Sequence, residues 1–303
     1  MKKVFISTSS FAKFDASPLR MLTDAGCEVH MNPYGRKLAV DEIKHFLSNN
    51  IDFLIAGTEP LTEDVLESAP KLRVISRCGT GLDNVDLKTA ERLGIKVFNT
   101  PDAPTAAVAE LTVGMILDLL RKISLMDREI RSGTWKKRMG NLLSGKTVGI
   151  IGFGKIGQRT ASCLVPFGCE VRYCDAREDL CVPGYEKVDL DILLQTSDIV
   201  SIHVSSSQRI LGEREIGLMK KGAWLINVSR GGVIDEDALY KALKGGHLEG
   251  AALDVFEQEP YGGRLREIDT VILTPHVGSY AKEARIGMEI QTVRNLLSAI
   301  ERQ

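Results

Sequence analysis

The segment 147–175 constrains the fold more strongly than any other part of this 303-residue sequence. An apolar run, TVGII, leads into the glycine pattern GFGKIG at 152–157, and a helical pattern opens within it. A second apolar run ends in Asp175, 18 residues after Gly157. A strand, a glycine turn, a helix and a second strand that ends in an acidic residue form the signature of a dinucleotide-binding unit. The segment therefore predicts a parallel α/β domain that binds such a cofactor.

Each residue of this pattern has a physical task. Gly152 permits the tight turn, Gly154 lets the backbone approach a pyrophosphate, and Gly157 lets the helix pack close to the strand. The helix N-terminus then faces the phosphates. Asp175 can accept hydrogen bonds from both ribose hydroxyls and would repel a 2′-phosphate, so the sequence favours NAD over NADP. Arg177 stands nearby and would offset part of that repulsion.

Apolar runs and helical patterns alternate along the rest of the chain, as expected for parallel α/β units. Residues 1–100 form one such block, and a second block starts at Lys146. Between them, a pattern that starts at Ala106 predicts one long helix ended by Gly133. Its first half is apolar almost all round, which predicts burial against the second domain or a partner subunit. We expect a last helix, 281–303, to pack back on the first block.

Composition argues against several classes of function. The net charge is −1 with no long run of either sign, so nucleic acid and an anionic membrane surface are not expected as partners. No apolar segment approaches the ~18 residues needed to span a bilayer, and the N-terminal apolar stretch is too short for a signal peptide. The six cysteines form no CxxC pair, so we expect no metal and no redox dithiol. A cytoplasmic protein with reduced thiols is the expectation.

Three chemically useful side chains follow predicted strands of the second block. Arg230 follows AWLINVS, Glu259 follows LEGAALDVF, and His276 stands in LTPHVGSY after TVIL. In open α/β sheets, ligands bind just beyond the carboxyl ends of the strands. Each residue alone fits an ordinary surface or core position equally well, but their shared position at successive strand ends predicts one ligand site.

The chemistry of these residues suits hydride transfer between a nicotinamide and a 2-hydroxy acid. Reduction of a carbonyl needs a proton donor for the developing alkoxide, and histidine is the natural donor near pH 7. A carboxylate at its other ring nitrogen would fix the tautomer and favour the protonated ring. Arginine offers a planar, permanently charged fork for a carboxylate. We therefore expect His276 as acid and base, Glu259 as its partner and Arg230 as the substrate anchor.

Seven motifs in the same order resemble the D-2-hydroxyacid dehydrogenase family, and within it most closely the D-3-phosphoglycerate dehydrogenase branch. They are RCGTGLDNVD at 77–86, NTPDAPTAAVAE, GKTVGIIGFGKIG, HVSSS, NVSRGG, DVFEQEP and TPHVGS. The resemblance covers nearly the whole chain. It implies an α/β fold of two Rossmann-like or flavodoxin-like domains with parallel sheets, the NAD-binding domain being inserted in the substrate domain. The implied boundaries are 1–100 with 280–303 for the substrate domain and 101–279 for the NAD-binding domain.

The resemblance also implies the site residues. For catalysis they are Arg230, Glu259 and His276. The implied cofactor-binding positions are Thr80, Gly152, Gly154, Lys155, Ile156, Gly157, Asp175, His203, Val204, Val228, Ser229, Arg230, Asp254, His276 and Gly278. The implied substrate-binding positions are Arg77, Gly79, Thr80, Arg230 and His276, and the backbone N–H groups of the 79–81 loop face the substrate carboxylate.

One departure from the family pattern bears on the substrate. The branch commonly carries an arginine at the strand end that reads IAGT here, where Ala56 stands, so Arg77 remains as the candidate phosphate ligand. We predict 3-phosphoglycerate as the substrate, with hydroxypyruvate, glyoxylate or D-lactate as alternatives. A non-catalytic protein that senses NAD, and phosphite oxidation, also stay open. We expect a homodimer, and no regulatory domain after the last helix.

Overall fold

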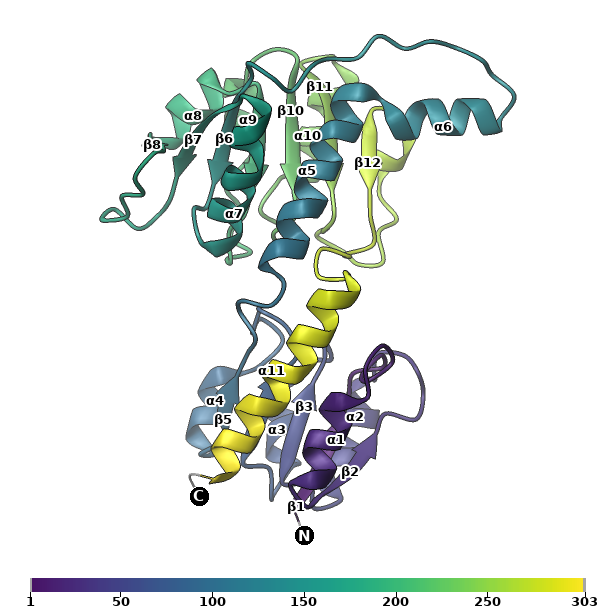
Figure 1. Cartoon of the computed structure of the whole chain (residues 1–303), viewed down its shortest axis with the longest axis vertical. Helices are drawn as coiled ribbons and strands as arrows, with labels where there is room; N and C mark the ends of the chain where they lie inside the picture. Colours follow the sequence, from purple (N-terminus) through teal and green to yellow (C-terminus); the bar gives the residue numbers. More distant parts are fainter. Residues whose placement is uncertain (1, 302–303) are drawn as a thin grey trace. The chain divides into compact units, whose positions relative to one another are not determined.

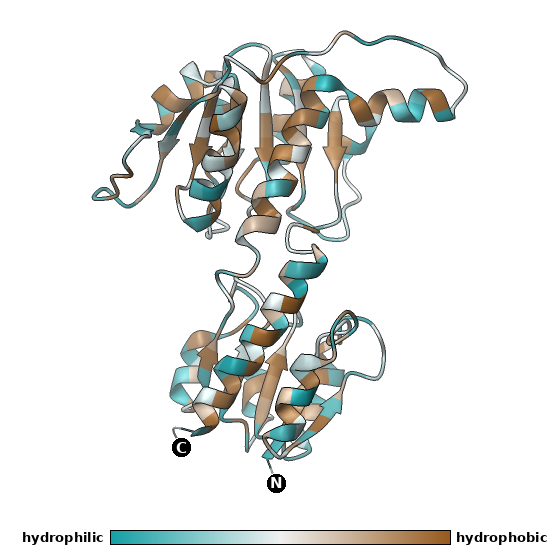
Figure 2. Ribbon diagram, viewed as in Figure 1, coloured by the Kyte–Doolittle hydropathy of each residue, from teal (hydrophilic) through white to brown (hydrophobic). Residues whose placement is uncertain are grey.

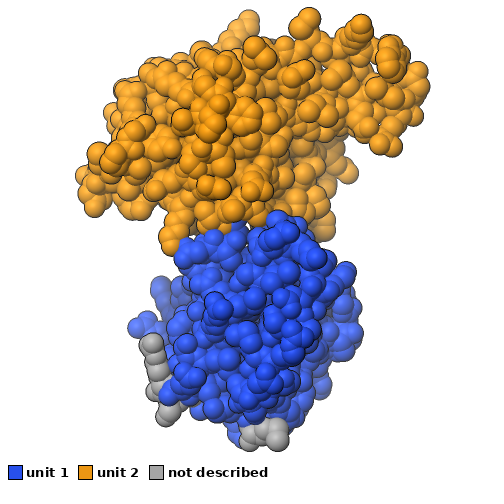
Figure 3. Space-filling view, viewed as in Figure 1, with its two compact units in different colours: residues 1–104, 279–303 blue, residues 105–278 orange. Residues whose placement is uncertain are grey.

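The structure is a computed structural model that describes residues 2–301. The chain divides into two compact units (Figure 3). Unit 1 comprises Met1–Pro104 and Ser279–Gln303, and unit 2 comprises Thr105–Gly278. Unit 2 is therefore inserted between the two segments that build unit 1.

Unit 1 is built on a parallel five-stranded sheet in the order β2-β1-β3-β4-β5 (Figure 1). Its strands are β1 (Lys2–Ile6), β2 (Cys27–Met31), β3 (Phe53–Ala56), β4 (Val74–Arg77) and β5 (Lys96–Phe98). Its helices are α1 (Ser17–Asp24), α2 (Val40–Ser48), α3 (Glu63–Glu67), α4 (Leu87–Arg92) and α11 (Lys282–Glu301). This strand order is the flavodoxin-like winding, which reverses between β1 and β3.

Two apolar layers cover the unit 1 sheet. One layer packs Leu22 of α1 with Val293 and Leu296 of α11 against β1, β3 and β4. The other layer packs α2, α3 and α4 on the opposite face, where Leu47 and Val65 are fully buried. The central strand β3 is apolar and buried along its length because both faces of the sheet are covered there, and it is brown in Figure 2. The predicted last helix is α11, and it completes the unit 1 core; its final predicted positions, 302 and 303, lie outside the described residues.

Unit 2 is built on a parallel seven-stranded sheet in the order β12-β11-β10-β9-β6-β7-β8. Its strands are β6 (Thr147–Ile151), β7 (Glu170–Cys174), β8 (Glu186–Lys187), β9 (Ile199–Ile202), β10 (Ala223–Asn227), β11 (Leu248–Leu253) and β12 (Val271–Leu273). Its helices are α5 (Thr105–Arg121), α6 (Ile123–Arg131), α7 (Lys155–Leu164), α8 (Leu190–Thr196), α9 (Glu213–Leu218) and α10 (Glu236–Lys244), with the 3-10 segments η1 (Val165–Phe167) and η2 (Arg264–Glu267). The order reverses between β6 and β9, and such a switch point is where doubly wound sheets bind their ligands.

Helices cover both faces of the unit 2 sheet. On one face α5 and α7 lie together, and Met115, Ile116 and Leu164 join the buried core there (Figure 1). On the other face lie α8, α9 and α10, where Leu193 and Leu239 are fully buried. The burial predicted for the apolar half of the long helix is confirmed, because α5 packs on the sheet of unit 2 itself.

The single long helix predicted from Ala106 to Gly133 is wrong. Lys122 has a left-handed backbone, φ 57°, and separates α5 from α6. The Asp118 side chain accepts the backbone N–H of Ser124 at 2.7 Å and also its hydroxyl, so it satisfies the start of a new helix. Figure 1 shows that α6 takes a different direction from α5. The sequence analysis also did not identify β8 and α8.

Three further properties follow from the described residues. No helix within 2–301 is both long and apolar enough to cross a membrane. Within the same range, no three His, Cys, Asp or Glu side chains gather so as to hold a metal ion. All six cysteines are free thiols.

Candidate active site

The predicted positions of unit 2 lie at the carboxyl ends of its strands. Beyond β6 lie Gly152, Gly154, Lys155, Ile156 and Gly157, beyond β7 Asp175, beyond β9 His203 and Val204, beyond β10 Val228, Ser229 and Arg230, beyond β11 Asp254 and Glu259, and beyond β12 His276 and Gly278. In unit 1, Arg77 ends β4, and Gly79 and Thr80 follow it. The chemistry of these edges is therefore set by the loops that leave each strand.

The glycine loop between β6 and α7 has the geometry that a dinucleotide requires. Gly152 has φ 88°, and a side chain there would begin 2.8 Å from the carbonyl oxygen of His203. A side chain at Gly157 would begin 2.3 Å from the Gly152 carbonyl oxygen, so the close approach of α7 needs glycine at both positions. At Gly154, the N-cap of α7, no described atom lies within 4 Å of a side-chain position, so the backbone is open. The loop therefore fits a pyrophosphate at the helix N-terminus.

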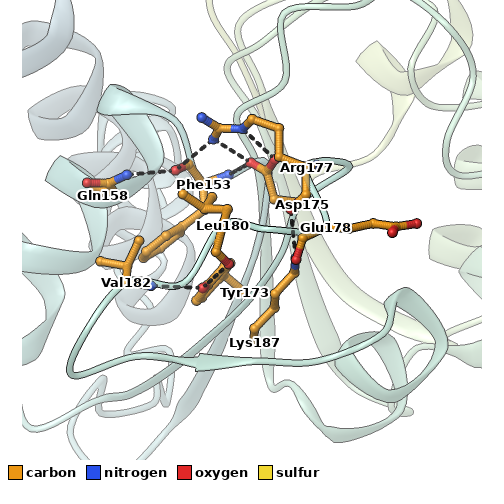
Figure 4. Close-up of polar contacts among 9 residues, drawn as sticks. All are labelled: Phe153, Gln158, Tyr173, Asp175, Arg177, Glu178, Leu180, Val182 and Lys187. Atoms are coloured by element: carbon orange, nitrogen blue, oxygen red, sulfur yellow. Dashed lines mark hydrogen bonds and ion pairs between the residues drawn. The ribbon is translucent and has the colours of Figure 1, made fainter.

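Asp175 lies directly after β7, beside the glycine loop (Figure 4). Its carboxylate accepts the backbone N–H of Phe153 at 2.7 Å and that of Arg177 at 3.0 Å. The Arg177 guanidinium pairs with both carboxylate oxygens, at 2.9 and 3.0 Å. The pKa of Asp175 is lowered to about 2, and the side-chain hydrogen bonds from Arg177 are the largest cause. The carboxylate is therefore ionised at any physiological pH.

The ring of His203 is turned into the domain. Its Nε2 atom lies 2.9 Å from the Ser201 hydroxyl, and its Nδ1 atom is buried without a hydrogen-bond partner among residues 2–301. Burial lowers the pKa of His203 to about 3, so the ring is neutral. The His203 carbonyl and the Val204 side chain, in contrast, border the position where a side chain at Gly152 would stand. The backbone of residue 203, and not its ring, therefore borders the glycine loop.

Asn227, the last residue of β10, holds the turn that carries Arg230. Its side-chain oxygen accepts the backbone N–H and the hydroxyl of Ser229, at 3.0 and 2.7 Å, and its amide donates to the Arg230 carbonyl at 3.0 Å. Val228 and Ser229 are buried, whereas Arg230 is partly exposed and its guanidinium donates to the Ser229 carbonyl at 2.8 Å. The arginine is therefore presented on a turn that a buried side chain fixes.

Glu259 and His276 form a hydrogen-bonded pair beyond β11 and β12. Glu259 Oε2 lies 3.0 Å from His276 Nδ1, and Glu259 Oε1 accepts the backbone N–H of Phe256 at 3.2 Å. Nε2 is therefore the ring nitrogen that faces away from the glutamate. Both side chains reach solvent, with exposed fractions of 53% for His276 and 39% for Glu259. A carboxylate fixed by its own loop and an accessible imidazole are the parts of a proton-transfer pair.

A buried carboxylate holds the loop that carries His276. One oxygen of Asp254 accepts the Thr274 hydroxyl at 2.6 Å and the Val277 N–H at 2.7 Å, and the other accepts the Gly278 N–H at 2.7 Å. His276 itself has φ 54°, in the left-handed region that few residues other than glycine adopt. Such strain persists only where the surroundings hold it in place. Asp254 therefore helps to set the position of the histidine.

A cavity of about 740 Å³ opens beside Glu259. It is lined by Ser207, Arg209, Gly231, Gly232, Phe256, Glu257 and Glu259. The Arg209 side chain pairs with Asp235 at 3.2 Å and with Glu257 at 2.9 Å, and so ties the start of α10 to the loop after β11.

The edge of the unit 1 sheet holds the predicted substrate loop. The Gly79 N–H donates to the Thr100 hydroxyl at 2.9 Å, and the Asn99 amide donates to the Thr80 carbonyl at 2.7 Å. The Arg77 guanidinium lies across Gly79, 1.2 Å from where a side chain there would begin, and donates to the carbonyl of the next residue at 2.8 Å. Arg77 is therefore folded back on its own loop.

Sequence reasoning missed the residues that hold these loops in place. They are Thr100, Phe153, Asn227, Phe256 and Thr274. Asn227 and Thr274 are polar residues at or just after the end of an apolar run, and that position is the signal that could have found them. Phe153 and Phe256 contribute backbone N–H groups, which no side-chain pattern marks.

Known proteins resemble the chain over most of its length. Residues 113–278 match the family model of the D-isomer specific 2-hydroxyacid dehydrogenase, NAD binding domain. A glyoxylate reductase of Thermococcus litoralis is 42% identical over 260 residues, which cover 80% of this chain and 78% of that protein. The human D-3-phosphoglycerate dehydrogenase is 37% identical over 301 residues, which cover 96% of this chain and 55% of that longer protein. The solved structure of the TT0316 protein from Thermus thermophilus is similar to this chain with a TM-score of 0.91 and 33% sequence identity. The match covers 99% of this chain and 97% of that one.

These similarities agree with the architecture and the glycine loop described above. The predicted α/β fold of two parallel-sheet domains and the predicted cofactor, NAD, are confirmed. The family model covers more than half of the chain and lies entirely within unit 2, which is the NAD-binding domain. The chain belongs to the D-isomer specific 2-hydroxyacid dehydrogenase family.

Proposed function

We propose that this protein reduces a small 2-oxo acid to its D-2-hydroxy acid, and catalyses the reverse oxidation, with His276 as the proton carrier. The nicotinamide supplies or accepts the hydride when it is bound. The Glu259–His276 pair is the observation that carries the proposal, because an imidazole in this position can protonate the alkoxide that forms as the carbonyl is reduced. Glu259 occupies Nδ1, so we assign proton donation to Nε2.

We assign the substrate carboxylate to Arg230 and to the loop after β4. A guanidinium binds a carboxylate through two parallel N–H groups, and the turn held by Asn227 supports this role. In unit 1, the Gly79 N–H already donates to Thr100, so we assign the N–H groups of Thr80 and Gly81 to the substrate. Unit 1 is then the substrate domain.

Two features favour an unphosphorylated substrate, glyoxylate or hydroxypyruvate. Ala56 offers no charge at the end of β3, and Arg77 turns back across Gly79. The similarity to a glyoxylate reductase supports the same assignment. The 3-phosphoglycerate predicted from the sequence is the second candidate, because a cation is present at residue 77 and a phosphoglycerate dehydrogenase matches almost the whole chain.

A panel of 2-oxo acids, followed at the nicotinamide absorbance, tests these assignments. Glyoxylate or hydroxypyruvate should give the highest kcat/KM, with pyruvate and 3-phosphohydroxypyruvate below them. Arg77→Ala should lower kcat/KM equally on all four acids, whereas a larger loss on the phosphorylated acid would favour 3-phosphoglycerate. Failure to turn over any acid would favour a protein that senses NAD, and NAD reduction by phosphite would identify phosphite oxidation.

We propose a homodimer formed through α6 and the irregular segment that follows it. α6 has no buried residue, and Ile123 and Ile130 are both exposed. Beyond it, Trp135 is 84% exposed, and Met139 and Leu142 are exposed as well. Several large apolar side chains exposed within one segment are typical of a protein–protein contact. Sedimentation equilibrium should give a dimer that the double variant Trp135→Ser, Met139→Ser converts to a monomer; a monomeric wild type would contradict the proposal.

We assign the protein to the cytoplasm on the state of its thiols. All six cysteines are free, and Cys27 and Cys78 are buried. Burial raises the pKa of the Cys174 thiol to about 12, so that thiol is inert. Free thiols suit a reducing compartment, and cell fractionation of the tagged chain tests the assignment.

A further inference from the structure

We propose that Glu236 is a positioning residue for the Glu259–His276 pair, which it aligns by holding the loop after β11. The inference rests on the proposed function, because it takes the glutamate of that pair as the partner of the proton carrier. Glu236 is the first residue of α10, and nothing in the proton transfer itself requires it. Its contribution comes from the backbone that it binds.

The backbone of this loop is hydrogen-bonded to Glu236. The Glu257 N–H donates to Glu236 Oε1 at 2.9 Å, and this N–H has no other acceptor among residues 2–301. Glu257 precedes Glu259 by two residues, so the bond fixes the chain just before the side chain that meets His276. Burial raises the pKa of Glu236, and the Glu257 N–H opposes that shift because it binds the charged form. The carboxylate is therefore held partly out of water, where the loop can bind it.

The start of α10 gives Glu236 a fixed base. The Asp235 side chain caps this helix by accepting the Ala238 N–H at 3.0 Å, and the apolar face of the helix is buried. Arg209 pairs with Asp235 at 3.2 Å and with the Glu257 side chain at 2.9 Å, so it is a second link between helix and loop. Both members of the Arg209–Glu257 pair are exposed, so this link contributes less than the hydrogen bond from the backbone to Glu236.

The same loop lies directly against the turn that carries Arg230. A side chain at Gly231 would begin 1.7 Å from the Phe256 carbonyl oxygen and 2.9 Å from the Glu257 nitrogen, so the two backbones are in contact. A shift of the loop would therefore move Glu259 relative to Arg230. A misplacement of about 1 Å can lower a rate by about a hundredfold. The bond between α10 and the loop is therefore expected to act on the rate of the reaction and not on the binding of its ligands.

Substitutions at Glu236 that separate reach from charge test the inference. Glu236→Ala should lower kcat for 2-oxo acid reduction by roughly tenfold and leave KM within about twofold of the wild type. Glu236→Gln keeps an acceptor oxygen at the same reach, so its kcat should stay within about threefold of the wild type. Glu236→Asp keeps the charge but is one methylene too short, so it should behave like Glu236→Ala. Fluorescence titration with NADH counts the folded sites, so that unfolded protein cannot account for a lower kcat.

Asp237→Ala is the matched control. It removes the next acidic side chain of the same helical turn from an exposed position, so it should leave kcat unchanged. A loss equal to that of Glu236→Ala would mean that the charge at the start of α10 matters and not the bond to the loop, and would overturn the inference.

A double-mutant cycle with Glu259→Ala separates this inference from the proposed function. If Glu236 acts through Glu259, Glu236→Ala should lower kcat by less than about twofold in the Glu259→Ala background. An equal loss in both backgrounds, a wild-type kcat in Glu236→Ala, or rescue by Glu236→Asp but not by Glu236→Gln would overturn the inference alone. A Glu259→Ala variant with the wild-type kcat would instead overturn the proposed function, and this inference with it.

Discussion

At the carboxyl edge of the unit 2 sheet, fixed polar groups hold the turns that carry the candidate residues. The Asn227 side chain holds the turn of Arg230, and the Asp254 carboxylate holds the loop of His276. Glu259 is fixed in the same manner by a backbone N–H of its own loop. Arg230, Glu259 and His276 are therefore each positioned by a fixed group to which no catalytic role is assigned.

The equivalent edge of unit 1 is closed on itself. The buried carboxylate of Glu59 accepts the Ser7 hydroxyl and the Gly57 N–H, the latter at 3.0 Å. The Asn84 amide donates to the Glu59 carbonyl at 2.7 Å. The substrate loop after β4 is held in the same way by the buried hydroxyl of Thr100. The polar side chains at this edge hydrogen-bond to one another or to the backbone. What remains for a ligand is the shape of the loops and their backbone N–H groups.

Under the proposed function, proton transfer is assigned to the Glu259–His276 pair of unit 2, whereas unit 1 contributes only backbone N–H groups to substrate binding. Substitutions that disturb the pair should therefore lower kcat, because they act on the transition state, and substitutions at the edge of unit 1 should raise KM.

The largest effect is expected at the proton carrier. His276→Ala should lower kcat for 2-oxo acid reduction by roughly a hundredfold to ten-thousandfold, the usual contribution of general acid catalysis, and leave NADH binding nearly unchanged. His247→Ala is the matched control, because His247 lies in unit 2 at the amino end of β11, the opposite end from the candidate site, and its ring meets the Ile216 carbonyl at 3.1 Å. A His276→Ala variant that keeps its activity would show that His276 is not the proton carrier, and so that the edge of unit 2 does not hold the acid–base residue.

Glu259→Gln should have the next largest effect. Loss of a charged hydrogen bond to the ring should lower kcat by roughly tenfold to a hundredfold. Steady-state rates measure this loss, and a Glu259→Gln variant with the wild-type kcat would exclude Glu259 as the partner of His276.

Asp254→Asn tests whether a buried support can act on kcat from a distance. The amide NH₂ would face a backbone N–H, so the free energy of unfolding should fall by about 1–3 kcal/mol and kcat by about tenfold as the 274–278 loop relaxes. Thr274→Val removes one of the three bonds and keeps the carboxylate, so its effects should be smaller. Thermal unfolding and steady-state rates measured together would decide, and an unchanged kcat in Asp254→Asn would assign this residue to stability alone.

The smallest effect is expected in unit 1. Thr100→Val removes the acceptor of the Gly79 N–H in a fully buried site, which costs about 1 kcal/mol and should raise KM for the 2-oxo acid several-fold while kcat stays near the wild-type value. Thr112→Val is the control, since Thr112 is equally buried in α5 and its hydroxyl donates to the Val108 carbonyl. A fall in kcat at Thr100 would mean that unit 1 also takes part in the chemistry.

The sequence predicts what short-range patterns encode. Glycine spacing, apolar runs and the residues that follow them are local, and they located the glycine loop, both sheets and all the strand ends that carry candidate residues. The break between α5 and α6 at Lys122 was not predicted because the apolar pattern continues through it. The start of α6 is instead marked by the Asp118 carboxylate, which accepts the Ser124 N–H. The bonds of Asp254 to residues 20–24 positions away, and the inward turn of the His203 ring, depend on packing that no local pattern records.

The insertion of unit 2 into unit 1 has a consequence for synthesis. Unit 2 is continuous in sequence and can fold on the ribosome before α11 has been translated. The five strands of unit 1 are made before unit 2, but one face of their sheet lacks Val293 and Leu296 until α11 emerges. Unit 1 is therefore translated first but buries its apolar surface last. A chaperone that binds nascent chains should bind the face of the unit 1 sheet that α11 covers.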